Sequence, residues 1–227
     1  MLGATIDKLQ VCQSVVHRAF AHIDAGFLPH VLDEALDCYQ HAVDIQEALG
    51  NKWEVARHRA SIAEIWVRRH EPRHALSEFQ RAIPVLRDHG AVFYLIDPLL
   101  GAANLLIDLG DLAAAREFLN EAGAIAAELG LADRLLQYHI LEARLDHAAG
   151  DTQCALERLR EMDRQATEPQ QQATVLYWRW RLGGEDDDRT AAEDLYAKLC
   201  RRIPKFDYTM RLEELRDQTT GSENLFE

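Results

Sequence analysis

Alanine recurs at a spacing of 40 residues through most of this chain of 227 residues. A large apolar residue follows each of these alanines after four positions, and a second small or apolar residue follows three positions later. The spacing i, i+4, i+7 is that of a helix with one packed face. The four copies are Ala35/Tyr39/Ala42, Ala75/Phe79/Ala82, Ala115/Leu119/Ala122 and Ala155/Leu159/Met162. The chain is therefore expected to fold as a series of similar helical repeats stacked in register.

Each repeat also contains another helix, which comes first in the repeat. It is indicated by another series of alanines, which lies 12 residues before the series described above. Small residues at such positions let two helices approach closely. The predicted turns also keep the spacing of 40, and glycine supplies the left-handed backbone that ends a helix. The alanines are Ala63, Ala103 and Ala143; the turns between repeats are at Gly50, Gly90 and Gly130, and those within repeats at His70, Gly110 and Gly150.

The residues after these turns are typical of helix starts. Asp111 and Asp151 are expected to be N-caps, and Pro72 suits a first helical turn because its missing N–H has no intrahelical partner there. In the first repeat, Pro29 ends a longer loop that begins at Gly26. We therefore expect one domain over 1–218, with repeats at about 5–49, 51–89, 91–129, 131–167 and a degenerate 170–203, and a capping helix at 206–218.

Within the degenerate repeat we expect helices at 170–182 and about 189–203. The acidic run 185–188 suits the N-terminal end of the second helix, where the helix dipole favours negative charge. The polar tail 219–227 resembles part of a protease-site linker from recombinant expression and is left out of the fold prediction. Tyr177, Trp178 and Trp180 form the densest aromatic cluster of the chain. We interpret this cluster as core that joins the fourth repeat to the C-terminal helices, with an interaction surface as the alternative.

This pattern resembles the tetratricopeptide repeat (TPR) family, which places a small residue late in a first helix and Ala-x3-Phe/Tyr-x2-Ala in a second. The period of 40 is similar to a subset with lengthened helices, as in bacterial regulatory proteins. The chain departs from the family where Arg59, Leu99 and His139 stand at its tryptophan position. The resemblance implies an all-α fold, a right-handed α-solenoid of antiparallel helix pairs.

Charge and composition limit the partners. The formal net charge of −13 repels a phosphate backbone and an anionic membrane, so neither nucleic acid nor a membrane is an expected partner. The four cysteines form no CxxC pair, and no apolar run approaches a membrane span or a secretion signal. We therefore expect a cytoplasmic protein with reduced thiols. Basic residues between Arg57 and Arg73 alternate with carboxylates, which indicates a helix face with ion pairs.

One short string suggests enzyme chemistry. His70-Glu71-Pro72-Arg73-His74 matches H-E-x-x-H, which on a continuous helix binds zinc through both histidines and uses the glutamate as a general base. Here the repeat register places His70 in a turn and Pro72 at the start of the next helix. We therefore rank a zinc hydrolase built on His70, Glu71 and His74 as a remote alternative, and expect no catalytic residue, metal or cofactor.

The resemblance also implies a binding groove lined by the first helix of each repeat. The groove positions carry both charge signs around apolar residues, and the positions of the lysines that chaperone-binding members use hold Val16, Ala60, Leu100 and Ile140 instead. A chaperone-tail receptor is therefore not expected. The predicted ligand-binding residues are Gln13, Phe20, Arg57, Glu64, Arg68, Leu100, Asn104, Asp108, Gln137, Arg144 and His147.

The leading hypothesis is a scaffold that binds a protein or an extended peptide in this groove. The alternative is a sensory or regulatory domain of a bacterial signalling protein, which would precede a nucleotide-cyclase or transcription output domain. A homodimer through another surface is compatible with either hypothesis, because repeat arrays use several surfaces for binding.

Overall fold

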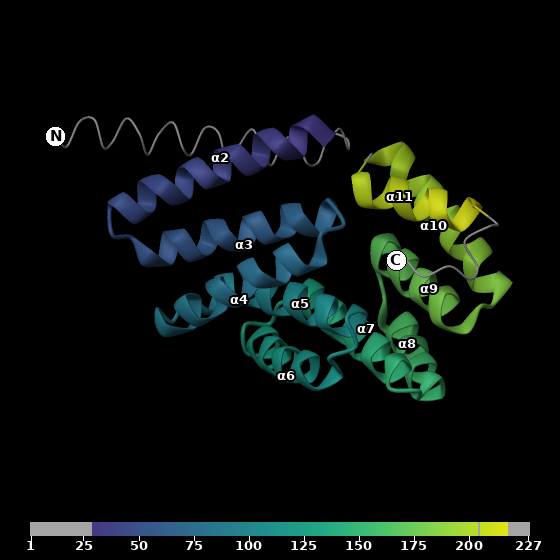
Figure 1. Ribbon diagram of the computed structural model, residues 1–227. Coiled ribbons are helices and arrows are strands. Elements are labelled where there is room, and N and C mark those ends of the chain that lie inside the picture. Colours follow the sequence, from purple (N-terminus) through teal and green to yellow (C-terminus); the bar gives the residue numbers. More distant parts are fainter. Residues whose placement is uncertain (1–28, 204, 218–227) are drawn as a thin grey trace. The chain divides into compact units, whose positions relative to one another are not determined.

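The computed structural model describes residues 29–203 and 205–217, and the described residues form helices joined by short turns (Figure 1). The predicted groove residues Gln13 and Phe20, and the tail 219–227, lie outside the described residues. The helices are α2 (Pro29–Ala48), α3 (Lys52–Arg68), α4 (Pro72–Asp88), α5 (Val92–Asp108), α6 (Leu112–Glu128), α7 (Ala132–Ala148), α8 (Thr152–Gln165), α9 (Pro169–Gly183), α10 (Asp186–Arg202) and α11 (Phe206–Arg216).

The chain divides into two compact parts, Met1–Leu141 and Glu142–Glu227. We call them the N-terminal and C-terminal modules and describe each by itself. The division falls within α7, so this helix contributes 132–141 to the first module and 142–148 to the second.

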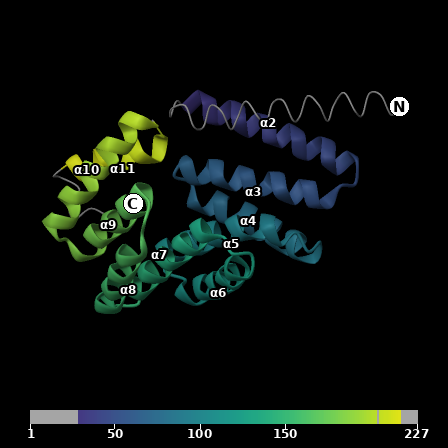
Figure 2. The same ribbon diagram turned by 180° about the vertical axis from the view of Figure 1, so that it is seen from behind.

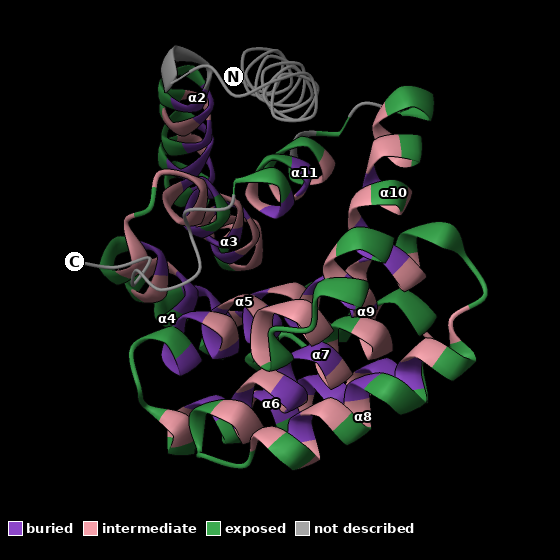
Figure 3. Ribbon diagram, turned by 90° about the vertical axis from the view of Figure 1, so that its right-hand side faces the viewer, coloured by how far each residue is buried: buried purple, intermediate pink, exposed green. Residues whose placement is uncertain are grey.

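Helices of the N-terminal module pack against their neighbours in chain order, from α2 to α6 (Figures 1 and 2). The alanine stripe found in the sequence is the packed face of the second helix of each repeat. Ala35, Tyr39, Ala75, Phe79 and Leu119 are each at most 1% exposed. Buried residues alternate with exposed ones along the helices (Figure 3), as amphipathic packing requires. The all-α fold of consecutive helix pairs is therefore confirmed.

Glycine allows α4 and α5 to approach closely. A Cβ atom added to Gly101 on α5 would lie 2.6 Å from Cζ of Phe79 on α4. Phe79 is fully buried, so its ring has little room to move. Gly123 on α6 makes a similar approach to the ring of Tyr138 on α7, because an added Cβ atom would lie 2.7 Å from Cε2 of that ring. The two glycines thus fix where the aromatic rings pack.

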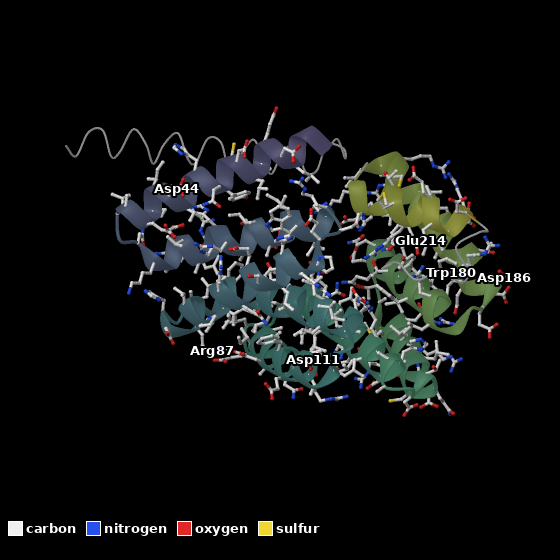
Figure 4. The ribbon with its side chains drawn as sticks, viewed as in Figure 1. Asp44, Arg87, Asp111, Trp180, Asp186 and Glu214 are labelled. Carbon is white, nitrogen blue, oxygen red and sulfur yellow. The ribbon has the colours of Figure 1, made fainter. Side chains whose placement is uncertain are left out.

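The turns between helices share one backbone conformation. Gly50, Gly90, Gly110, Gly130 and Gly150 all have positive φ angles. His70 occupies the equivalent place and is the described residue other than glycine with a positive φ, at 57°. The repeat register therefore predicted this turn correctly although no glycine marks it. The side chain of Asp111 (Figure 4) accepts a hydrogen bond from the backbone N–H of Ala114, which confirms the predicted N-cap.

Replacing His70 with glycine is expected to stabilise the N-terminal module by about 1 kcal/mol, because a side chain in the left-handed region is strained and glycine is not. Urea denaturation followed by circular dichroism measures the change. The matched control is Gly110→Ala, at the equivalent turn with φ 81°, which should lose a similar amount, about 1 kcal/mol. A His70→Gly variant less stable than the parent would contradict this account of the turn.

Helices α8 to α11 of the C-terminal module also pack in chain order. Their core contains Ala173, Tyr177, Ala192, Tyr196, Leu212 and Leu215, with Trp178 and Trp180 packed against it. The interpretation of the aromatic cluster as core is therefore correct. Polar contacts also join α9 to α11: the Tyr177 hydroxyl donates to a carboxylate oxygen of Glu214 at 2.5 Å, and Arg181 pairs with the same carboxylate (Figure 4 labels Glu214 and Trp180).

Helix α10 begins at Asp186, three residues before the predicted start at 189. Glu185 is therefore the N-cap, and the other three residues of the acidic run form the first helical turn. Asp186, Asp187 and Asp188 are favourable there because the N-terminal end of a helix carries partial positive charge. Asp188 also has a tertiary role, since Arg179 of α9 pairs with it at 2.8 Å.

Candidate functional site

Most of the predicted groove residues lie on the first helices of the repeats in the N-terminal module. Helix α3 carries Arg57, Glu64 and Arg68, and α5 carries Leu100, Asn104 and Asp108. Helix α7 adds Gln137 within the same module. Helices α3 and α5 contact each other directly, although α4 separates them in sequence. These side chains therefore come from neighbouring helices, as the repeat pattern requires.

Charged side chains of both signs meet on these helices. The guanidinium of Arg134 on α7 binds the carboxylate of Asp97 on α5 through two contacts, Nε–Oδ1 at 2.6 Å and Nη2–Oδ2 at 3.0 Å. Both side chains remain partly exposed. Glu64 on α3 interacts electrostatically with Asp97, Arg68 and Arg134. We call Glu64, Arg68, Asp97 and Arg134 the charged cluster.

Glu64 has an unusual combination of properties. Its side chain is exposed to solvent, yet burial of the carboxyl by surrounding protein raises its pKa, and repulsion from Asp97 raises the pKa further. Arg68 and Arg134 oppose the shift. A carboxyl that solvent reaches but that protein surrounds is expected on a concave surface. This combination favours Glu64 as part of a binding face, because perturbed titratable groups concentrate at functional sites.

Other predicted groove residues differ in how much surface they offer. Leu100 is only 5% exposed, so it supports the face from below and offers little area to a ligand. Arg57 is held by Glu54, at 2.8 Å, within its own helix. Asn104 is half-buried, whereas Asp108 and Gln137 are exposed.

The last two predicted groove residues belong to the C-terminal module. The guanidinium of Arg144 lies 4.6 Å from the ring centroid of Trp178, a cation–π contact. Nδ1 of His147 lies 2.9 Å from the hydroxyl oxygen of Thr152. Both side chains thus have partners inside their own module.

Arg134 and Asp97 were not among the ligand-binding residues predicted from the sequence. Arg134 precedes Gln137 by three residues, so it extends the same helical stripe by one turn. This spacing is the sequence signal that could have added Arg134 to the predicted groove residues. The ion pair itself joins residues 37 apart in sequence and could not be read from the pattern.

The predicted ion pairs are present in part: Arg57 pairs with Glu54 on its own helix, whereas Arg59 and Arg69 pair with carboxylates of other helices. Arg59 contacts Glu78 at 2.9 Å and Glu47 at 3.1 Å, and Arg69 contacts Asp33 at 2.8 Å. These pairs link α3 to α2 and α4. The pairs with the exposed Glu47 and Asp33 are each expected to contribute little to stability, typically about 0.2–1 kcal/mol, whereas the pair of Arg59 with Glu78 is partly buried.

The H-E-x-x-H string does not lie on one helix. His70 is in the turn between α3 and α4, and His74 lies in the exposed first turn of α4, where its Nδ1 is 2.8 Å from a carboxylate oxygen of Glu71. The two imidazoles therefore lack the shared helical face that the zinc motif requires. Across 29–203 and 205–217, no group of three or more His, Cys, Asp and Glu residues is arranged to hold a metal ion.

Among the described helices, none has the length and apolar character needed to cross a lipid bilayer.

Comparison with known proteins shows the fold. The Rap conjugation gene regulator of the plasmid pLS20, in complex with the Phr* peptide, superposes with a TM-score of 0.72 at 15% identity, covering 95% of this chain and 60% of that one. A Rap protein complexed with Competence and Sporulation Factor superposes with a TM-score of 0.64 at 15% identity. The match covers 82% of this chain and 53% of that protein. A Podosopora anserina putative kinesin light chain with nearly identical TPR-like repeats superposes with a TM-score of 0.60 at 14% identity. The match covers 85% of this chain and 94% of that protein.

The sequence itself matches no protein-family model and no curated relative. The structural likeness is nonetheless extensive, and it shows that the chain has the fold of a TPR-like α-solenoid. The chain spans 60% and 53% of the lengths of the two Rap proteins, so it corresponds to part of each.

Proposed function

We propose that this protein binds a peptide, either free or as an extended segment of a protein, on the face formed by α3, α5 and the N-terminal part of α7. The observation that carries the proposal is the charged cluster. Four ionisable side chains from three helices meet there, and Glu64 is both exposed and surrounded by protein. Perturbed ionisable groups concentrate at functional sites, and charges of both signs on one face can give it specificity for a ligand.

Two further observations support binding over catalysis. One structural neighbour is in complex with the Phr* peptide, and it is a regulator of conjugation genes. The charged cluster also lacks a nucleophile with an adjacent base, and the H-E-x-x-H residues are divided between a turn and a helix start. We therefore propose, more specifically, that the protein has a regulatory role and that peptide binding carries it out.

A selection from a library of random short peptides, using the purified chain as bait, tests the proposal. The consensus peptide is then titrated by fluorescence polarisation against the parent and against Glu64→Gln/Asp97→Asn. We expect this variant to bind about tenfold more weakly or worse, since it removes two charges from the face. Circular dichroism verifies that the variant is folded.

The matched control is Arg116→Gln/Glu117→Gln, which alters two exposed charges on α6, a second helix of its repeat. Its affinity should stay within about twofold of the parent. Equal losses in both variants, or no loss in the first, would place the binding surface elsewhere.

A further inference from the structure

Three consecutive apolar residues are exposed at the start of α5. Val92, Phe93 and Tyr94 are 46%, 61% and 47% exposed. The Tyr94 ring lies 5.6 Å from the Phe93 ring and 5.6 Å from the ring of Trp53 at the start of α3. We call these four residues the aromatic patch. Trp53 is half-buried, so the exposed rings are those of Phe93 and Tyr94. A cluster of exposed apolar residues marks an interaction site more often than scattered single residues do.

The fold does not require this patch. In the repeat register, positions 92–94 correspond to Lys52, Trp53 and Glu54 on α3, and to Ala132, Asp133 and Arg134 on α7. The same helical turn therefore tolerates polar and charged residues elsewhere in the array. A first helical turn also favours acidic residues, and α5 has none there.

The patch is continuous with the charged cluster. Phe93 and Tyr94 precede Asp97 by four and three residues, so they lie on the same side of α5, one helical turn before it. One turn of an α-helix rises about 5.4 Å. Alternate residues of an extended peptide, which project to the same side, are about 6.6 Å apart. An extended ligand can thus place one side chain on the rings and the next same-side residue beside Asp97, within reach of Glu64 in the same cluster.

We infer that the aromatic patch and the charged cluster form one site, which takes an extended peptide with a large apolar side chain two residues from a lysine or arginine. The apolar side chain covers the rings of Phe93, Tyr94 and Trp53. The basic side chain meets the carboxylate of Glu64, which Asp97 repels, while Arg134 holds the carboxylate of Asp97. This inference rests on the proposed function and specifies the ligand of that face.

The test uses the consensus peptide from the library selection described above. We expect it to contain the apolar and basic residues at this spacing, and to bind Phe93→Ser/Tyr94→Ser about tenfold more weakly than it binds the parent. Moving the basic residue of the peptide by one position should weaken binding to the parent by a similar factor, about tenfold. The control variant Leu49→Ser removes an exposed apolar side chain from a turn outside the patch and should bind normally.

Each alternative outcome is distinct. A peptide that requires Glu64 and Asp97 but binds Phe93→Ser/Tyr94→Ser normally would overturn this inference and leave the proposed function intact. A peptide insensitive to both variants, or no selected peptide, would overturn both. Analytical ultracentrifugation tests whether a second copy of the chain covers the aromatic patch. If the parent is a dimer and Phe93→Ser/Tyr94→Ser is a monomer, the patch is a self-association surface and the inference is wrong.

Discussion

Replacing Phe79 with alanine is expected to lower the free energy of unfolding of the N-terminal module by about 3–5 kcal/mol. Phe79 is 1% exposed, and its ring fills the space that Gly101 leaves on the adjacent helix. No side chain at position 101 can relax into the resulting cavity, because glycine has none. The loss should therefore lie at the upper end for a buried phenylalanine.

Urea denaturation can assign this loss to the N-terminal module. Trp53 and Trp66 report on this module, whereas Trp178 and Trp180 belong to the other one. A chain with two compact parts need not unfold in one step. Variants that retain only one of the two tryptophan pairs allow the unfolding of each module to be followed separately by fluorescence. The exposed-site control Gln80→Ala, next to Phe79 on α4, should change stability by less than about 0.5 kcal/mol. A loss below about 1 kcal/mol for Phe79→Ala would contradict the packing described above.

Replacing Arg179 with methionine is expected to destabilise the C-terminal module by about 2–4 kcal/mol near neutral pH. Arg179 on α9 contacts Asp163 of α8 and Asp188 of α10, each at 2.8 Å, so it joins three helices. Asp188 is 8% exposed. Without Arg179, a nearly buried carboxylate would be left without its cation, and this accounts for most of the expected loss.

The pH dependence of this loss distinguishes charge from packing. Burial already raises the pKa of Asp188 above its ordinary value, while Arg179 lowers it. Removing Arg179 raises the folded-state pKa further, so the folded variant binds a proton more readily than the unfolded chain. The penalty is therefore largest at neutral pH and decreases as the pH falls through the raised pKa and Asp188 becomes neutral.

Stability measured between about pH 7 and about pH 4 should show the difference between parent and variant becoming smaller. In Arg179→Met/Asp188→Asn, the second change removes the unpaired charge and should recover a large part of the loss at neutral pH. A loss that is the same at both pH values, and that the second change does not reduce, would show that Arg179 acts through packing alone.

The fold was largely predictable because its determinants are periodic. The alanine stripe, the glycines at intervals of 40 and the N-cap aspartates are local signals, and all recur in the structure at the expected places. Even the turn at His70 followed from the register. The acidic run lies at a helix N-terminus as expected, but α10 begins three residues before the predicted start because Asp186, Asp187 and Asp188 form its first turn.

The candidate site was less predictable for the same reason. Glu64 and Arg68 were predicted because the resemblance places them at groove positions of α3. Groove positions do not reveal which charges meet across helices. The contact between Asp97 and Arg134 depends on the rotation of α5 and α7 about their axes. The exposure of Phe93 and Tyr94 depends on it as well, because an apolar run at a helix start is equally compatible with core.

Hydrogen–deuterium exchange of the full chain, with and without the selected consensus peptide, tests the central claim most directly. We predict that the peptide slows exchange in α3, α5 and the N-terminal part of α7, which carry Glu64, Asp97 and Arg134. Protection confined to α4 and α6, the second helices of their repeats, would contradict the account and place the ligand on the opposite side of the helix pairs.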